Sequence, residues 1–172
     1  MLKIFNLLKD DYPSIVNNLV VKIIQKDINY TIESINNPSF DIWEEKWGYH
    51  FYTRLVQLKF IKDYLETKNR FDKVFGVNQS IYELYEKFKL TVQDHLKENS
   101  IISSFEENGN VLRYDDASVL LAFCHIDFDE EILKYIKIKF VEKTIIKLLD
   151  YYIKKYDNRS LLLIGRYEND AW

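Results

Sequence analysis

Apolar side chains recur every three or four residues along three long stretches of this chain, and this pattern restricts its fold more than any other feature. The stretches run from Ser14 to about Ile35, from Tyr49 to about Lys68 and from Gln79 to about Glu98. A repeat of this length places the apolar side chains on one face of a helix. We therefore predict three long helices, each of which buries one face.

Two further helices are predicted in the second half of the chain. Asp115–Asp116 is a favourable helix start before residues 117–124, and Asp129 begins a helix with apolar positions that continue to Tyr156. No strand-like alternation competes with these helices, although residues 161–164 are ambiguous. The chain is thus predicted to be all-α, with about five long helices and polar connections near residues 36–48, 69–77, 99–114 and 157–172.

Composition excludes several classes of protein. The chain has 172 residues, of which 47% are hydrophobic, so it can bury a sizeable core and is not disordered. Its net charge is only -3 and both signs are spread along it, which argues against nucleic acid and against a polybasic membrane surface. Cys124 is the single cysteine, so no internal disulfide can form. No secretory signal is visible, and the compartment stays open.

The segment between Asp41 and Trp47 combines three carboxylates with two indoles. The carboxylates are those of Asp41, Glu44 and Glu45, and the indoles are those of Trp43 and Trp47. Carboxylates are usually solvated and Trp is usually buried, so this mixture predicts the wall of a polar pocket. Sugar chemistry uses such a mixture, because acids protonate and orient the sugar while flat rings lie against it.

A structural alternative for two of these residues is a helix cap. Asp41 could be an N-cap with Glu44 three residues later, in the pattern of a capping box. Gly48 follows too soon for a long helix, so we favour the pocket.

The segment resembles the active-site signature of glucoamylases, glycoside hydrolase family 15. Their pattern of an acid, an aliphatic residue and Trp-Glu-Glu is matched by residues 41–45, and the following Gly and aromatic-Thr step by Gly48 and residues 51–53. A second block, residues 164–170, looks like the family's Gly-Arg-Tyr loop, with a Glu-Asn-Asp ending. A weaker third match is formed by residues 115–118. The resemblance implies an (α/α)6 barrel, a toroid of twelve helices in two rings.

This chain departs from the family pattern in what it omits. It could supply fewer than half of the twelve helices, and nothing in it matches the family's earlier Arg-Asp sugar-binding segment or its later catalytic base. We therefore expect residues 1–172 to be a partial glucoamylase-like catalytic domain, truncated at both ends. A complementing segment of the same domain is then an expected partner.

The resemblance implies exo-hydrolysis of α-1,4-glucosidic bonds in starch, glycogen or maltodextrins with inversion. Glu44 would be the general acid, and burial against Trp43 beside two like charges would raise its pKa. The substrate-binding residues would be Asp41, Trp43, Glu45, Arg166 and Asp170, with Arg166 offering a planar fork of donors to neighbouring hydroxyls. Because the base is not found, the isolated chain is predicted to be inactive.

Two other functions remain open. A related enzyme could act on trehalose or glucodextran, since the acid motif is shared. A non-catalytic (α/α)6 barrel, of the type in the phosphorylase kinase regulatory subunit, is the alternative from another class. We expect no cofactor and no metal, because Cys124 and His125 are adjacent on a helix, point about 100° apart and have no second cluster to join.

Overall fold

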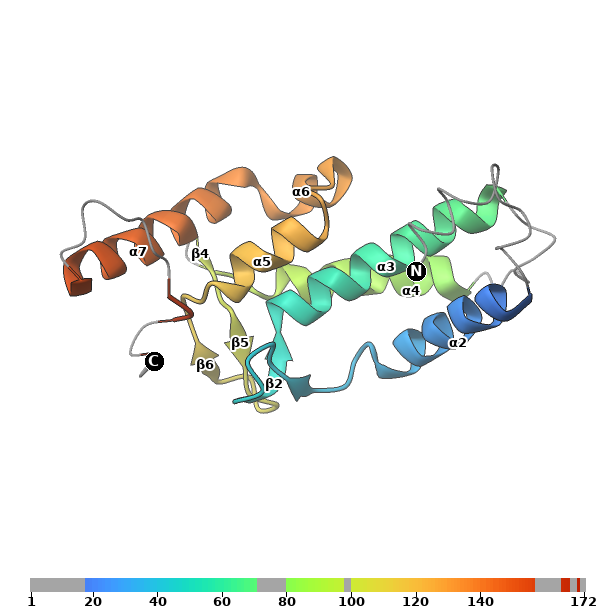
Figure 1. Cartoon of the computed structure of the whole chain (residues 1–172), viewed down its shortest axis with the longest axis horizontal. Helices are drawn as coiled ribbons and strands as arrows, with labels where there is room; N and C mark the ends of the chain where they lie inside the picture. The colour runs from blue at the N-terminus through green and yellow to red at the C-terminus, as the bar shows by residue number, and fades with distance from the viewer. Residues whose placement is uncertain (1–17, 71–79, 98–99, 157–164, 168–169, 171–172) are drawn as a thin grey trace. The chain divides into compact units, whose positions relative to one another are not determined.

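The computed structural model describes residues 18–70, 80–97, 100–156, 165–167 and 170 (Figure 1). The described residues fall into two compact units. One is built within residues 18–36 and 57–88, and the other within residues 37–56 and from 89 onward. None of the described helices is long and apolar enough to cross a bilayer.

The first unit contains helical segments that follow the predicted apolar stripes. They are α2 (Asn18–Ser34), most of α3 (Phe51–Arg70) and most of α4 (Ser80–Gln93). Each buries the face that its sequence pattern marks, and the buried side chains include Ile24, Ile28, Leu58, Ile61, Leu65, Ile81 and Phe88. The three long helices are thus confirmed, although α4 ends earlier than predicted.

The second unit contains three more helices: α5 (Ser118–His125), α6 (Glu130–Ile136) and α7 (Ile138–Tyr156). Helix α5 begins where Asp115–Asp116 predicted a helix start. Asp129 caps α6 as expected, because its carboxylate accepts the backbone N–H groups of the second and third residues that follow. The single helix predicted from Asp129 to Tyr156 is wrong, since Lys137 has φ 57°, which interrupts a right-handed helix between α6 and α7.

The all-α prediction is also wrong in part, because the second unit contains a small antiparallel sheet. Its four strands lie in the order β1-β2-β5-β6, and a separate pair is formed by β3 (Leu96–Lys97) and β4 (Ser100–Ile101). The sheet strands are β1 (Ser39–Phe40), β2 (Trp47–His50), β5 (Ser104–Phe105) and β6 (Val111–Arg113).

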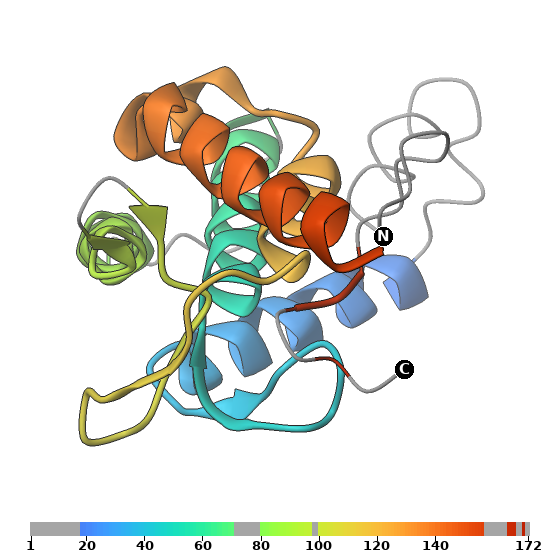
Figure 2. The same cartoon turned by 90° about the vertical axis from the view of Figure 1, so that its left-hand side faces the viewer.

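Most of these strands lie in two of the predicted polar connections, residues 36–48 and 99–114. Strand β2 continues to His50 and β3 covers Leu96–Lys97, so these residues are wrongly predicted as helical. Each strand has only two to four residues, too few for alternation to stand out. The sheet forms by pairing of residues that are far apart in the sequence, such as Tyr49 and Phe105, which lie opposite each other in antiparallel strands. In Figure 2 the β5–β6 hairpin is the yellow loop that extends from the sheet at the lower left. The chain is therefore mainly helical with a small sheet. The ambiguous residues 161–164 lie outside the described residues.

Gly48 allows β2 and β5 to approach closely. A Cβ atom on Gly48 would lie 2.2 Å from the carbonyl oxygen of Phe105. His50, buried two residues later, bonds the Oγ of Ser104 through Nδ1 (2.8 Å) and donates from Nε2 to the Ser39 carbonyl (2.9 Å). Together these contacts join β1, β2 and β5, and so fix both ends of the turn that follows β1.

Candidate functional site

Residues 41–46 form a tight turn between β1 and β2, and Asp41 determines its shape. The Asp41 N–H donates to the Lys46 carbonyl (2.9 Å), and the Asp41 carbonyl accepts the Glu44 N–H (3.0 Å). The Asp41 carboxylate accepts the Glu45 N–H (2.8 Å). Since this segment is a hairpin turn with a positive φ of 59° at Glu44, the capping-box alternative is wrong.

Glu44 projects from this turn into solvent. Its expected burial against Trp43 is therefore wrong, since Glu44 is exposed while Trp43 is only partly so. The positive φ at Glu44 turns the chain at this point, which is why proximity in sequence to Trp43 does not bury the carboxyl. Among the described residues, Glu44 has no side-chain hydrogen bond or ion pair.

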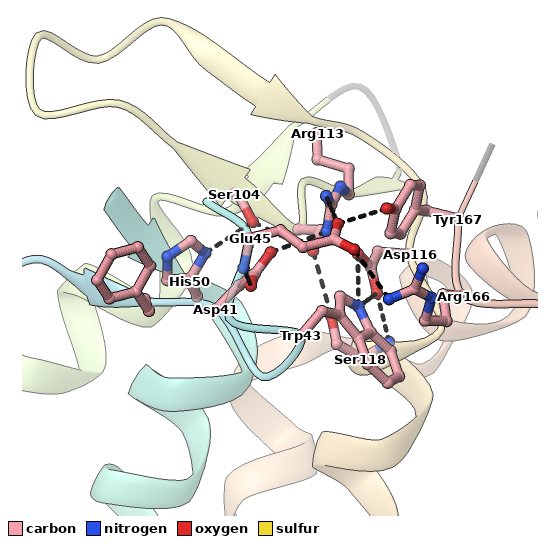
Figure 3. Close-up of polar contacts among 12 residues, drawn as sticks. Asp41, Trp43, Glu45, His50, Ser104, Arg113, Asp116, Ser118, Arg166 and Tyr167 are labelled. Carbon is pink, nitrogen blue, oxygen red and sulfur yellow. Dashed lines mark hydrogen bonds and ion pairs between the residues drawn. The ribbon is translucent and has the colours of Figure 1, made fainter. Parts of the chain in front are cut away.

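Arg113, at the end of β6, lies at the centre of a cluster of carboxylates (Figure 3). Its Nη1 donates to Asp41 (3.0 Å) and to Asp116 (2.8 Å), and its Nη2 donates to Glu45 (3.2 Å). The Arg113 side chain is 10% exposed, and those of Asp41 and Asp116 are 5% and 1% exposed. Buried charges are stable only when they are paired, and here one guanidinium pairs with three carboxylates.

A loop whose described residues are 165–167 and 170 contacts this cluster from a distant part of the sequence. Arg166 donates from Nη1 to Glu45 (2.9 Å), and from Nε and Nη2 to the two oxygens of Asp170 (2.9 and 2.7 Å). The Tyr167 hydroxyl donates a short hydrogen bond to Glu45. The backbone also contributes, because the Ala117 N–H donates to the Arg166 carbonyl (2.6 Å).

The two tryptophans of the motif differ in their surroundings. The Trp43 indole N–H donates to both carboxylate oxygens of Asp116 (3.0 and 3.2 Å), and its ring lies 5.6 Å from the Arg166 guanidinium carbon. Trp47 is exposed, and its indole N–H donates to Glu107 at 2.9 Å. Trp43 therefore belongs to the cluster, whereas the described contacts of Trp47 lie outside it.

The ionisation of the cluster follows from these contacts. The Tyr167 hydrogen bond, and then the charges of Arg166 and Arg113, lower the pKa of Glu45, with partial desolvation opposing them. The hydrogen bonds that Arg166 donates to Asp170 raise the pKa of Arg166 further above its ordinary value. The Glu45 bond raises the pKa of Tyr167. At neutral pH the cluster thus holds an ionised Glu45, a cationic Arg166 and a neutral Tyr167.

The structure brings together five of the six predicted site residues. Asp41, Trp43, Glu45, Arg166 and Asp170 are joined by hydrogen bonds and ion pairs, whereas Glu44 lies on the same turn with its side chain in solvent.

Arg113 was not predicted as a site residue, and Asp116 was predicted only as a helix start and as part of the weaker third match to the family pattern. Their spacing of three residues, in a segment that also contains Asp115, was the available signal. It was not used because residues 99–114 were assigned to a polar connection. Within the part of the chain that the structure describes, no group of three or more His, Cys, Asp or Glu side chains could hold a metal ion.

Comparisons with known proteins give a consistent result. The family model for glycosyl hydrolases family 15 matches residues 2–171. A glucoamylase of Blastobotrys adeninivorans is 31% identical over 136 residues, which cover 73% of this chain and 20% of that protein. Glucoamylase GLU1 of Saccharomycopsis fibuligera is 36% identical over 59 residues, 34% of this chain and 11% of the relative. The chain thus matches a fifth or less of the length of these relatives. No solved structure matches it.

Proposed function

The chain belongs to glycosyl hydrolase family 15, and on this premise we propose that it carries part of a glucoamylase-type site. The substrate would be an α-glucan or a maltooligosaccharide, with α-1,4-glucosidic bonds hydrolysed with inversion. Residues 1–172 would form part of a catalytic domain and part of an (α/α)6 barrel. A complementing segment of that domain would be its partner.

One observation supports this proposal above the others. Arg166 and Glu45, which stand 121 positions apart in the sequence, form an ion pair at 2.9 Å. Each comes from a separate block that resembles the family signature. The two side chains are 25% and 29% exposed, so the pair joins the two blocks at a surface that a ligand can reach.

Glu44 is the proposed general acid. Its exposed carboxyl stands beside the anchored Glu45 and is open to a ligand. An inverting hydrolase needs a second carboxyl as base, roughly 6.5–9.5 Å from the acid. The neighbouring carboxylates of Asp41, Glu45 and Asp170 already accept hydrogen bonds from arginines, so we assign none of them as base. We therefore expect the isolated chain to bind glucan without releasing glucose.

Ligand-detected NMR on the purified full chain tests the binding. We expect saturation transfer to maltose and maltoheptaose but not to cellobiose, whose β-linkage is the control. Arg166→Gln should abolish the transfer, because an amide cannot replace the guanidinium fork. Lys46→Gln, an exposed change on the same turn, should preserve it. No transfer from either maltooligosaccharide would contradict the proposal.

Turnover and specificity need separate measurements. A coupled glucose assay with maltose should detect no glucose released by this chain. Glucose release that Glu44→Gln abolishes would show that the chain does contain a catalytic base. A preference for trehalose or glucodextran in the binding experiment would favour the related enzymes instead. If the folded protein binds none of these sugars, the result would favour the non-catalytic (α/α)6 barrel.

A further inference from the structure

We propose that Arg113 is the positioning residue that holds the turn of residues 41–46 against the loop that contributes Arg166, Tyr167 and Asp170. This inference rests on the proposed function, because it concerns how the Glu44–Glu45 turn is held for a sugar. Arg113 would act through its neighbours and would not touch the sugar itself.

The position of Arg113 explains why it can reach three segments. Its backbone is fixed by pairing in the sheet, where it lies opposite Ser104. From there its guanidinium contacts Asp41 and Glu45 on the turn and Asp116 before α5 (Figure 3). A side chain with two separate donor nitrogens is needed for this, since three carboxylates approach from different directions.

Arg113 also contacts the loop directly, through the face of the Tyr167 ring. Its guanidinium carbon lies 3.7 Å from the centre of the Tyr167 ring, within the range of a cation–π contact. The Tyr167 hydroxyl and Arg113 Nη2 both donate to the same oxygen of Glu45. The loop therefore contacts the turn through a carboxylate that Arg113 orients.

The charges show why a neutral residue could not replace Arg113. Asp41, Glu45 and Asp116 are held around it, and Arg166 contacts only Glu45 of these three. Without the Arg113 charge, the three carboxylates would repel one another, and two of them, Asp41 and Asp116, are buried and would lose the cation that pairs with them.

The functional consequence follows from the contacts of Glu45. Both of its oxygens already accept hydrogen bonds, one from Arg166 and the other from Arg113 and Tyr167. Glu45 thus joins the turn to the loop, and Arg113 sets where it lies. A displacement of about 1 Å in such a turn can lower catalysis by about a hundredfold.

The Trp43 indole N–H gives a spectroscopic test in the full chain. It donates to Asp116, which Arg113 also contacts, and Trp43→Phe assigns its signal in a nitrogen-15 correlation spectrum. In Arg113→Gln we expect the indole signal to be displaced from its wild-type position, because Asp116 loses the guanidinium that holds it and the turn loses its contacts with the end of β6. Lys46→Gln, which removes an exposed charge from the same turn, should behave as the wild type.

Arg113→Lys separates positioning from charge. Lys keeps the charge without the planar fork, so the indole signal of Arg113→Lys should still be displaced from the wild-type position. A folded Arg113→Gln whose indole signal lies at the wild-type position would overturn the inference. If Arg113→Gln does not fold, Arg113→Lys decides, and an undisplaced signal would overturn it. Failure of maltose to bind the wild type would instead count against the proposed function and leave this result unaffected.

Discussion

Trp43 and Asp116, which are 73 positions apart in the sequence, are joined by a hydrogen bond in which the indole N–H lies 3.0 and 3.2 Å from the two carboxylate oxygens. Asp116 also accepts the Ser118 N–H (2.7 Å) and a bond from Arg113. One buried carboxylate thus connects the turn, the end of β6 and the start of α5.

The first prediction concerns this carboxylate. Asp116→Asn should lower the free energy of unfolding by about 1–3 kcal/mol, because the amide has one acceptor oxygen and no charge for Arg113. Urea unfolding followed by circular dichroism measures the change. Glu142→Gln, at an exposed position on α7, should change stability by less than about 0.5 kcal/mol. Equal effects of the two variants would contradict the role given to Asp116.

Gly48 and Gly109 should both resist substitution, for different reasons. Gly48→Ala would place its Cβ atom 2.2 Å from the Phe105 carbonyl oxygen, so β2 and β5 must separate, at a cost of about 1–3 kcal/mol or more. Gly109 has open space around its Cβ position but a φ of 87°, so Gly109→Ala should cost about 1 kcal/mol through backbone strain alone. Gly109→Asn should cost less, since Asn tolerates positive φ. Thermal unfolding of the three variants tests this order, and a Gly48→Ala variant as stable as the wild type would refute it.

The helices were predictable because each carries its pattern in one continuous stretch. Ile24, Ile28 and Phe88 are buried as the spacing required. The sheet was not predictable in this way, because strands of two to four residues acquire their partners from positions far along the chain, such as Tyr49 and Phe105. The interruption at Lys137 was hidden for a related reason, since a lysine gives no local signal for positive φ.

The candidate site was also only partly predictable from the sequence. Resemblance identified Glu45 and Arg166 by residue type and spacing, and the structure joins them. It did not identify Arg113, whose importance comes from the three carboxylates that the fold gathers around it. The exposure of Glu44 was also missed, because it depends on backbone geometry and not on the apolar neighbour beside it in sequence.

The strain at Lys137 leads to a stabilising substitution. Lys137→Gly should raise the free energy of unfolding by about 0.5–1 kcal/mol, because glycine adopts φ 57° without steric cost. Lys143→Gly, in the interior of α7, should have the opposite sign and lower stability by about 1 kcal/mol. Urea midpoints of the two variants give the comparison. A destabilised Lys137→Gly would show that the break between α6 and α7 is not strained.

His95 should make the stability of the protein depend on pH. Its Nδ1–H donates to the Ile102 carbonyl (2.7 Å), and its Nε2 accepts from Arg54 (3.2 Å). Burial and the Arg54 charge lower its pKa to about 3, so the folded protein keeps this ring neutral while the unfolded chain protonates it below about pH 6.5. The unfolded state then binds more protons, and stability must fall as the pH is lowered.

The expected loss from His95 is up to about 3 kcal/mol between pH 6.5 and pH 4.5, at about 1.4 kcal/mol per pH unit. Unfolding free energies at several pH values measure the slope. His95→Asn should flatten it, because Asn does not titrate, whereas the exposed control Lys143→Gln should keep it. An unchanged slope in His95→Asn would show that other groups cause the acid sensitivity.

Glu44 and Glu45 are adjacent, chemically identical and differently bonded, so paired substitutions separate their contributions. Glu44→Gln should leave stability within about 0.5 kcal/mol of the wild type, because the side chain is exposed and projects into solvent.

Glu45→Gln should lower the free energy of unfolding by about 1 kcal/mol at pH 7, since a neutral amide weakens the contacts with Arg113, Arg166 and Tyr167. The loss of stability in Glu45→Gln should become smaller as the pH falls. The pKa of Glu45 is lower in the folded protein than in the unfolded chain, so its contribution to stability is fully present above the unfolded-state value near 4.5. That contribution is lost as the folded carboxylate takes up its proton. Unfolding curves of both variants at pH 7 and pH 3.5 measure these differences, and an equal, pH-independent effect of the two substitutions would show that Glu45 does not anchor the turn.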